Sequence, residues 1–177
     1  MKKQTYRYFI PALLGLILFM LVGCNNETVK KTEDENVQTI EAVLKNTFTG
    51  PSDEWIQALD ATEEEGSFES FNQYLEDLYK DYFADDASYL EFVNSFGATI
   101  MNGPIRNDYR LKVENIEYEQ TASKEIIYNF SLKLQYQKED SDSAEVGTVN
   151  GQANVNADHK IEKMVIRLGD FWNKIEE

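Results

Sequence analysis

The chain has 177 residues, of which 42% are hydrophobic and 12% aromatic. That is enough to build the core of one domain, and it excludes a chain that is disordered throughout. With one cysteine and one histidine, no intrachain disulfide can form, and a Cys–His metal site or dyad would need both residues. The formal net charge is −15, and no lysine and arginine cluster follows the first seven residues, which argues against a nucleic-acid or anionic-lipid surface.

The N-terminus has the pattern of a secretory signal. Lys2, Lys3 and Arg7 precede an uncharged stretch, Phe9–Gly23. Its 15 residues are too few for a comfortable bilayer span, which needs roughly 20. The length and the cationic start fit a signal peptide instead, so residues 1–23 are predicted to be removed.

The stretch ends in Leu21-Val22-Gly23-Cys24, which resembles the lipobox of bacterial lipoproteins, Leu-x-Gly/Ala-Cys. A small residue at Gly23 lets a peptidase close over the bond, and the Cys24 thiol is the nucleophile that takes a diacylglyceryl group. The resemblance implies cleavage before Cys24, lipidation of Cys24 and a place on the extracytoplasmic face of the cell membrane. The alternatives are an ordinary membrane anchor and a cleaved secretory signal without lipid.

Cleavage there would leave 154 residues with a formal charge of −18, because three cations and no acids are lost. We expect the lipid, and not the acidic protein surface, to hold the mature chain at the membrane, since two acyl chains give stable anchoring. Residues 24–36 are polar and are predicted to be a flexible tether. Residues 37–177 are predicted to be a single domain that folds as a monomer.

Helical spacing of apolar residues predicts four helices in the first half of this domain. The third has the strongest pattern, with an aromatic stripe that begins at Phe68. Glycine and proline in Gly97–Asn107 predict a loop there. The four helical segments are Val37–Phe48, a segment capped by Ser52, Phe68–Phe83, and a segment that runs from Asp85 or Asp86 to Gly97.

From Asp108 the apolar residues alternate, which predicts strands. The phase changes near Glu114-Asn115 and indicates a bulge in the first strand. Ile126–Tyr136 alternates without a break and predicts a long strand with one buried face. Two further strands, Glu145–Ala157 and Ile161–Leu168, follow, and Phe171, Trp172 and Ile175 form an apolar tail that needs cover.

Helices followed by strands without intervening helices predict an α+β fold, with N-terminal helices packed on a curved four-stranded antiparallel meander. This arrangement resembles the nuclear-transport-factor-2-like superfamily, also called cystatin-like, on the aromatic third helix, the long strand Ile126–Tyr136 and the hairpin Asn154–Ile161. Members often have Asp-Gly-Lys-Ile before the last strand. Here His159 stands at the glycine, which demands a strained or different turn.

The function expected from these features is non-catalytic binding of a protein or of a small apolar ligand. Tyr74, Tyr79, Tyr128 and Tyr136 are candidate ligand-binding residues, because they could line a cone between the third helix and the sheet with hydroxyl groups. The alternative for these tyrosines is plain core packing. A cone filled by Phe68, Phe92, Phe130 and Trp172 would leave only the outer surface for function.

The superfamily resemblance also implies an alternative function, an acid–base isomerase or dehydratase that uses a carboxylate and a tyrosine or protonated acid. No acid falls on an inward-facing strand position in this sequence pattern, so we do not expect catalysis. His159 is expected to be an exposed turn residue, and Glu139–Glu145 a solvated hairpin tip without the spacing of a calcium loop. No cofactor, no metal and no nucleic-acid partner are expected.

Overall fold

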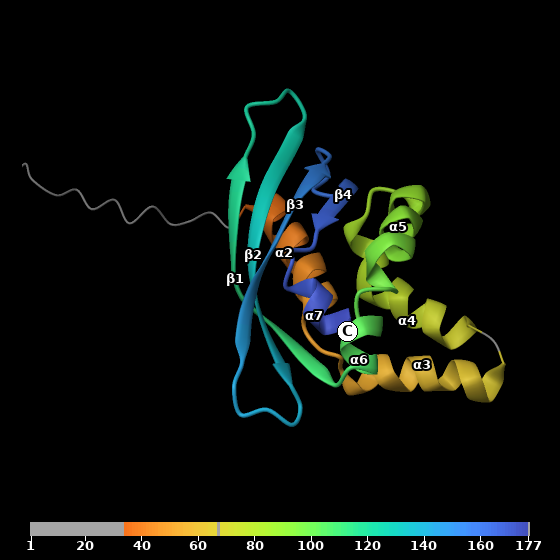
Figure 1. The fold of residues 1–177 in the computed structure, drawn as a ribbon. Helices are drawn as coiled ribbons and strands as arrows, with labels where there is room; N and C mark the ends of the chain where they lie inside the picture. Colours follow the sequence, from red (N-terminus) through yellow and green to blue (C-terminus); the bar gives the residue numbers. More distant parts are fainter. Residues whose placement is uncertain (1–33, 67, 177) are drawn as a thin grey trace, which may run out of the picture. The chain divides into compact units, whose positions relative to one another are not determined.

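The computed structural model describes residues 34–66 and 68–176, with the helices followed by four strands (Figure 1). The predicted α+β fold, helices packed on a four-stranded antiparallel meander, is confirmed. The predicted signal peptide, Cys24 and most of the predicted tether lie outside the described residues. All described residues belong to one compact unit, Glu33–Glu177.

The first described helix, α2 (Glu35–Phe48), begins two residues before the predicted domain boundary. The side chain of Asp34 accepts a hydrogen bond from the backbone N–H of Asn36 at 3.0 Å and so caps the helix. The tether predicted to run to Asn36 therefore ends earlier. The helix buries one apolar stripe, and four of its residues have no exposed surface: Ile40, Val43, Leu44 and Phe48.

Helices α3 (Asp53–Glu65) and α4 (Glu69–Tyr79) contact each other and form a hairpin. Ser52 caps α3 as predicted, accepting from the backbone N–H of Trp55. Phe68 was predicted to face the core, and this is wrong: it precedes the first turn of α4 and is 65% exposed. Phe71, one turn later, is buried edge-on against Trp55 with ring centroids 5.1 Å apart.

The 3₁₀ turn η1 (Lys80–Tyr82) leads to α5 (Asp86–Phe92), which continues as the π-helical turn η2 (Val93–Gly97). The loop predicted for Gly97–Asn107 instead contains a short helix, α6 (Asn102–Arg106). Its proline, Pro104, lies in the first turn, where a missing N–H leaves no intrahelical bond unmade.

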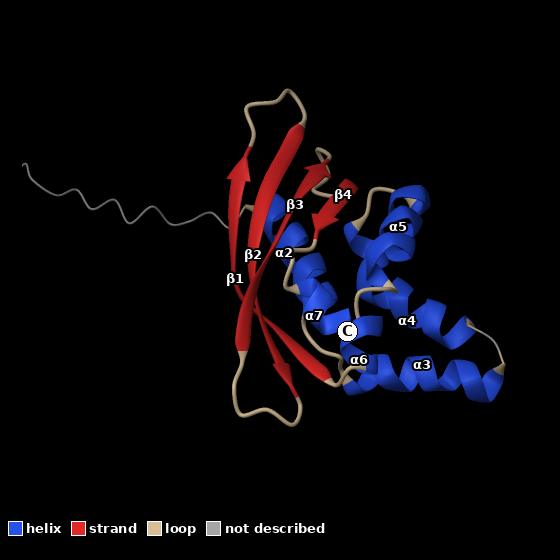
Figure 2. Ribbon diagram, in the orientation of Figure 1, coloured by secondary structure: helices blue, strands red, loops and turns tan. Residues whose placement is uncertain are grey.

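The sheet is a meander of β1 (Tyr109–Gln120), β2 (Ile126–Lys138), β3 (Glu145–Val155) and β4 (Ile161–Arg167), each antiparallel to the next. The helices of the described residues lie on one side of it (Figure 2). The chain then forms α7 (Trp172–Glu176), in which Trp172 is buried, so the apolar tail finds cover.

Strand β1 lies at an edge of the sheet. Its register with β2 shifts between Val113 and Asn115, so Glu114 is the extra residue of the predicted bulge. Gly50 pairs with Leu111 from outside the sheet, and each residue donates its N–H to the other's carbonyl at 3.0 and 2.7 Å. Part of the edge is thereby closed.

The core fills the space between helices and sheet. Helices α2 and α6 contact β1 and α5 contacts β4, whereas α4 packs mainly on α3 and α2. This differs from the expectation that the third helix lies opposite the long strand. Two glycines of β3 make room for aromatic rings, because a Cβ atom on Gly147 would lie 2.4 Å from Phe171 and one on Gly151 would lie 2.2 Å from Phe130.

Candidate functional site

The four candidate tyrosines lie in different parts of the domain. Tyr74 is a half-buried residue of α4 that packs at the border of the core. Tyr79, one turn further, is almost fully buried beside Phe92, with ring centroids 5.3 Å apart. Its hydroxyl lies 3.3 Å from the hydroxyl of Thr47 on α2, and burial raises the pKa of Tyr79. Tyr79 therefore joins two helices within the core.

Tyr128, on the inward face of β2, belongs to a group of side chains that we call the N-terminal cluster: Asp34, Glu35, Asn36, Tyr128 and His159. The Tyr128 hydroxyl donates to Asp34 at 2.5 Å and accepts from the amide of Asn36 at 3.4 Å. Burial raises the pKa of Tyr128, and the Asp34 carboxylate that accepts its proton acts in the same direction. The cluster thus ties the start of α2 to the sheet.

His159 closes this cluster from the turn between β3 and β4. Its Nδ1 lies 2.8 Å from the Asn36 side-chain oxygen, and its Nε2 lies 3.0 Å from a Glu35 carboxylate oxygen. The backbone of His159 has φ +61°, the left-handed conformation anticipated for a residue at this glycine position. His159 lies in a turn, as expected, and its side chain is 45% exposed, but both of its ring nitrogens have partners.

Tyr136 lies at the other end of the same face of β2. Its hydroxyl donates to Glu145 at 3.0 Å, and Lys174 of α7 lies 2.9 Å from the same carboxylate oxygen. Lys174, and then the Tyr136 hydroxyl, hold the pKa of Glu145 below its ordinary value, whereas burial raises the pKa of Tyr136. This contact fastens the C-terminal helix to β3.

The structure does not bring the four tyrosines together. Tyr128 and Tyr136 are eight residues apart on one strand, which separates them by about 26 Å at the usual rise. Tyr79 bonds to α2 and not to the sheet. The hydroxyls of Tyr79, Tyr128 and Tyr136 each have a protein partner, so each joins two elements of the fold at a different place. A shared ligand-binding role for them stays a prediction.

The aromatic residues named as a possible core filling are mostly buried. Phe92, Phe130 and Trp172 are all buried, whereas Phe68 is not. One open hollow of about 420 Å³ lies on the surface between β1 and β2, lined by Arg110, Gln137, Lys138 and Glu139. Arg110 is already engaged there, with Glu139 at 2.8 Å and the carbonyl of Pro51 at 2.6 Å.

Within residues 34–66 and 68–176, no three histidine, cysteine or acidic side chains are grouped closely enough to hold a metal ion. The same residues include no helix that is both long and apolar enough to cross a membrane. The carboxylates that face tyrosines, Asp34 and Glu145, are both solvent-exposed. The arrangement can therefore hold elements together, but it does not present a carboxyl group kept neutral by burial.

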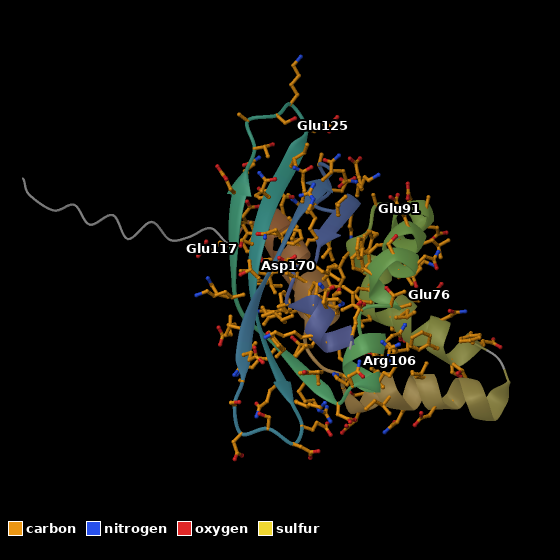
Figure 3. The ribbon with its side chains drawn as sticks, in the orientation of Figure 1. Glu76, Glu91, Arg106, Glu117, Glu125 and Asp170 are labelled. Atoms are coloured by element: carbon orange, nitrogen blue, oxygen red, sulfur yellow. The ribbon has the colours of Figure 1, made fainter. Side chains whose placement is uncertain are left out.

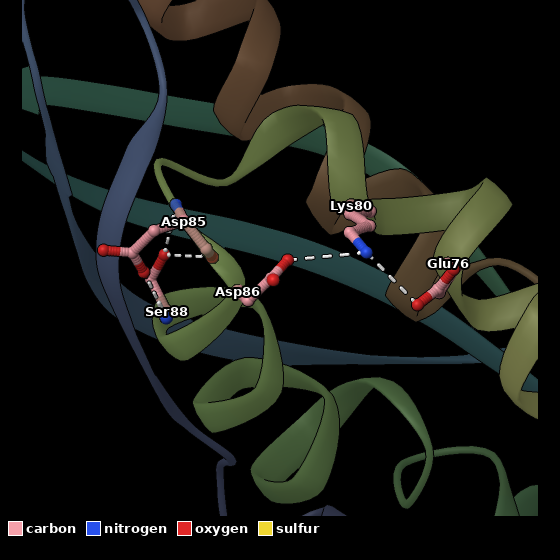
Figure 4. A network of polar contacts seen from close by, with 5 residues as sticks. All are labelled: Glu76, Lys80, Asp85, Asp86 and Ser88. Atoms are coloured by element: carbon pink, nitrogen blue, oxygen red, sulfur yellow. Dashed lines mark hydrogen bonds and ion pairs between the residues drawn. The ribbon is translucent and has the colours of Figure 1, made fainter.

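Acidic residues concentrate in the helical half of the domain. Residues 34–108 include 17 acidic and three basic residues, a formal charge of −14. Where α4 meets α5, Lys80 lies 3.2 Å from Glu76 and 3.4 Å from Asp86 (Figure 4). In the same view Asp85 caps α5, since its carboxylate accepts from the Ser88 backbone N–H at 2.8 Å. Lys80 is thus one of the three basic residues in this part of the chain.

The part of the chain that forms the sheet has little net charge. Residues 109–168 include ten acidic and eight basic residues, a formal charge of −2. We call the odd-numbered residues 127–137 of β2 and the even-numbered residues 146–154 of β3 the outer sheet face. These residues are exposed or half-buried, none is acidic, and Lys133 alone is charged. Figure 3 shows Glu117 of β1 at the border of this face, on the side away from the helices.

The alternation in Ile126–Tyr136 predicts one buried face, which leaves the polar face of β2 to water without marking it as a surface for binding. The signal was present in the period of two. In a chain with 32 acidic residues among 177, two neighbouring strands with no acid at their outward positions depart from the general composition. The lack of acids becomes a surface property only when the register places Ser131 beside Asn150 and Asn129 beside Gln152.

No family model matches the chain, and no curated protein matches it. Three solved structures resemble it. The TraH protein of the Gram-positive conjugative plasmid pIP501 is 14% identical over 78% of this chain and 96% of that chain, with a TM-score of 0.46. A periplasmic fragment of TraM is 10% identical over 76% and 96%, with a TM-score of 0.40.

The third structure is a mutant of the helical cell shape determining protein Pgp2 from Campylobacter jejuni. It is 12% identical over 62% of this chain and 38% of that chain, with a TM-score of 0.32. Similarity at this level carries no conclusion about the activity or the partners of this chain.

Proposed function

We propose that the chain is a lipoprotein anchored to the extracytoplasmic face of the cell membrane through Cys24, and that its domain binds another molecule without catalysis. The order of helices followed by a meander also supports membership of the nuclear-transport-factor-2-like superfamily. The anchor is supported by the sequence of Leu21-Val22-Gly23-Cys24 after a cationic start and an uncharged stretch.

One observation supports a non-catalytic role above the others: the groups that an acid–base enzyme would use are engaged in holding the fold. Tyr128 and Tyr136 donate to Asp34 and Glu145, and both of these carboxylates are exposed. A general acid of this enzyme type needs a carboxyl group whose pKa is raised by burial, and that of Glu145 is lowered. The outer surface is then the place where the domain acts.

The anchor is tested by the intact mass of protein extracted from membranes of its native host. We expect loss of residues 1–23 and a gain of acyl mass, and we expect Cys24→Ala to release the chain or leave it unprocessed. Cys24→Ser is a control of nearly the same size that still lacks the thiol, and it should behave like Cys24→Ala. Unmodified, fully soluble wild-type protein would overturn the anchor.

The absence of catalysis is tested by complementing a strain that lacks the gene. Tyr128→Phe, Tyr136→Phe and His159→Ala each remove a group that could transfer a proton. Full complementation by all three variants supports a binding role. If a variant folds with an unchanged circular dichroism spectrum and yet fails to complement, the acid–base alternative gains the support that it lacks here.

A further inference from the structure

We propose that the outer sheet face binds a second copy of this chain, so that two domains pack sheet against sheet around a two-fold axis. The inference goes beyond the proposed function because it does not depend on the lipid anchor, and it replaces the expectation of a monomer. The distribution of charge, the order of charges along β1 and the area of the sheet all favour this pairing.

Two copies can meet through their helical sides or through their sheet sides. The helical half has a formal charge of −14 over residues 34–108, and the sheet half has −2 over residues 109–168. Helix-to-helix contact would bring two strongly acidic surfaces together. Sheet-to-sheet contact keeps those surfaces on opposite sides of the pair, farther apart than the Debye length of about 8 Å at physiological salt. Electrostatics thus favours the sheet side for self-association.

The outer sheet face is poor in charged side chains. Its centre consists of uncharged amide, hydroxyl and aliphatic side chains, and its one charge is Lys133. Charges lie at the border, on the outward positions of β1 and at Lys163 and Arg167 of β4, which pair with Asn154 and Asn150 of β3. Protein interfaces have this arrangement, with charged residues depleted at the centre and retained at the rim. Within the described part of the chain, helices lie only on the opposite side of the sheet (Figure 2).

The order of charges along β1 is complementary to itself. Lys112 is outward near the start of the strand, and Glu117 and Glu119 are outward near its end. A two-fold axis that lies in the face, perpendicular to the strands, brings the start of β1 opposite the end of the other copy's β1. Lys112 then faces the second copy's Glu119, and the arrangement occurs twice in the pair.

The register places that axis at the middle of the sheet. Lys112 pairs with Gln135 and Glu119 pairs with Asn129 on β2, so the level midway between them is near Leu132. At this level Lys133 comes close to Glu117 of the second copy, one strand away. Both side chains are exposed, and neither takes part in any of the ion pairs found among the described residues.

The sheet also offers enough area for a stable contact between two copies. Strands β2 and β3 are paired over eleven residues, from Ile126–Val155 to Tyr136–Glu145. With a rise of about 3.3 Å per residue and about 4.8 Å between strands, the outer sheet face together with the outward sides of β1 and of the shorter β4 presents roughly 600 Å². Two such faces bury about 1,200 Å² in total, the lower bound for a specific, stable interface. Packed twisted sheets align within about 30°, which suits this geometry.

Cross-linking tests the contact in the full-length chain in its native membrane. Ser131→Cys places a thiol at the centre of the face, and Ser95→Cys places one at an exposed site on the helical side. With a short bis-maleimide we expect a product of twice the chain mass for Ser131→Cys and several-fold less for Ser95→Cys. The wild-type chain, treated in the same way, measures any cross-link that forms through Cys24. Urea unfolding verifies that both variants fold.

Charge reversal tests the geometry of the pair in the Ser131→Cys background. Lys112→Glu should lower the cross-link yield several-fold. The new carboxylate would face Glu119 of the other copy, and this repulsion would occur at two places in the pair. Lys112→Glu together with Glu119→Lys should restore the yield. A double variant that cross-links no better than the single one would overturn this orientation.

Two further outcomes would overturn the second copy as the occupant. One is equal yield for Ser131→Cys and Ser95→Cys, and the other is a product joined to a different protein. The same measurement with Cys24→Ala separates this inference from the anchor. A cross-link that persists without membrane attachment supports the pairing by itself, and an anchored chain without a cross-link overturns the pairing alone.

Discussion

The hydroxyl of Tyr128 donates a 2.5 Å hydrogen bond to the carboxylate of Asp34, which is the N-cap of α2. A residue of the second strand thus holds the first turn of the first described helix. Because Asn36 and His159 join the same cluster, three segments that are far apart in the sequence meet at this point.

We expect Tyr128→Phe to lower the free energy of unfolding by about 1 kcal/mol, since it removes the hydrogen bonds of the hydroxyl with Asp34 and Asn36 and leaves the packing of the ring. Urea unfolding followed by circular dichroism measures the change. Tyr109→Phe is the matched control, because the Tyr109 hydroxyl takes part in none of the hydrogen bonds found among the described residues. Equal effects of the two substitutions would contradict the role of the N-terminal cluster.

Phe71 and Phe68 provide a second comparison within one helical turn. Phe71→Ala should cost about 3–5 kcal/mol, because the ring is buried against Trp55. Phe68→Ala should cost little, since Phe68 is 65% exposed. The same urea experiment decides, and a large loss for Phe68→Ala would place that ring in contacts that the structure lacks.

Gly151 is a position in the sheet with no room for a side chain. A Cβ atom there would lie 2.3 Å from the carbonyl oxygen of Val165 and 2.2 Å from the ring of Phe130. Gly151→Ala should therefore destabilise by at least about 1–3 kcal/mol. Gly103→Ala is the control, as its nearest neighbour is the flexible side chain of Glu176 at 3.4 Å. Thermal unfolding measures the stability of both variants. The midpoint temperature of Gly103→Ala should be clearly higher than that of Gly151→Ala.

The stability of the domain should depend on pH through Asp85, the N-cap of α5. Hydrogen bonds from Ser88 to the carboxylate hold the pKa of Asp85 below its ordinary value of 3.8. Its contribution is present above that value and is lost as the pH falls through the lower pKa of the folded state, because the unfolded chain binds the proton more readily.

Asp85→Asn keeps a capping side chain but does not titrate. Unfolding midpoints measured from about pH 6 to about pH 2 should show wild type losing stability relative to Asp85→Asn towards acid. Parallel curves for the two proteins would contradict this role of the carboxylate.

The strands could be predicted from the sequence because a period of two leaves little choice of which face is buried. Alternation in Ile126–Tyr136 gave the long strand, and the change of phase at Glu114 gave the bulge. The helix α6 could not be predicted, since five residues that include Gly103 and Pro104 have no periodicity to read. Phe68 was misplaced because helical spacing does not reveal at which residue the helix starts.

The candidate site was harder to predict than the fold, for a physical reason. Tyrosines at helical or strand spacing indicate which face is buried, but the partner of a hydroxyl is set by tertiary contacts. Asp34 and Tyr128 are separated by 94 positions, and His159 and Asn36 by 123. Nothing in the local sequence of the turn at His159 indicates that its ring reaches the start of α2.

The two irregular features of β1 limit how its edge can pair with strands of other chains. A free strand edge is a template on which other chains can add strands and start aggregates. Here Gly50 occupies both the N–H and the C=O of Leu111, and the extra residue Glu114 interrupts the pairing pattern two residues beyond Lys112. An incoming strand would find neither a continuous row of free backbone groups nor an uncharged margin. Crowded copies of the domain are therefore protected from amyloid-like growth through this edge.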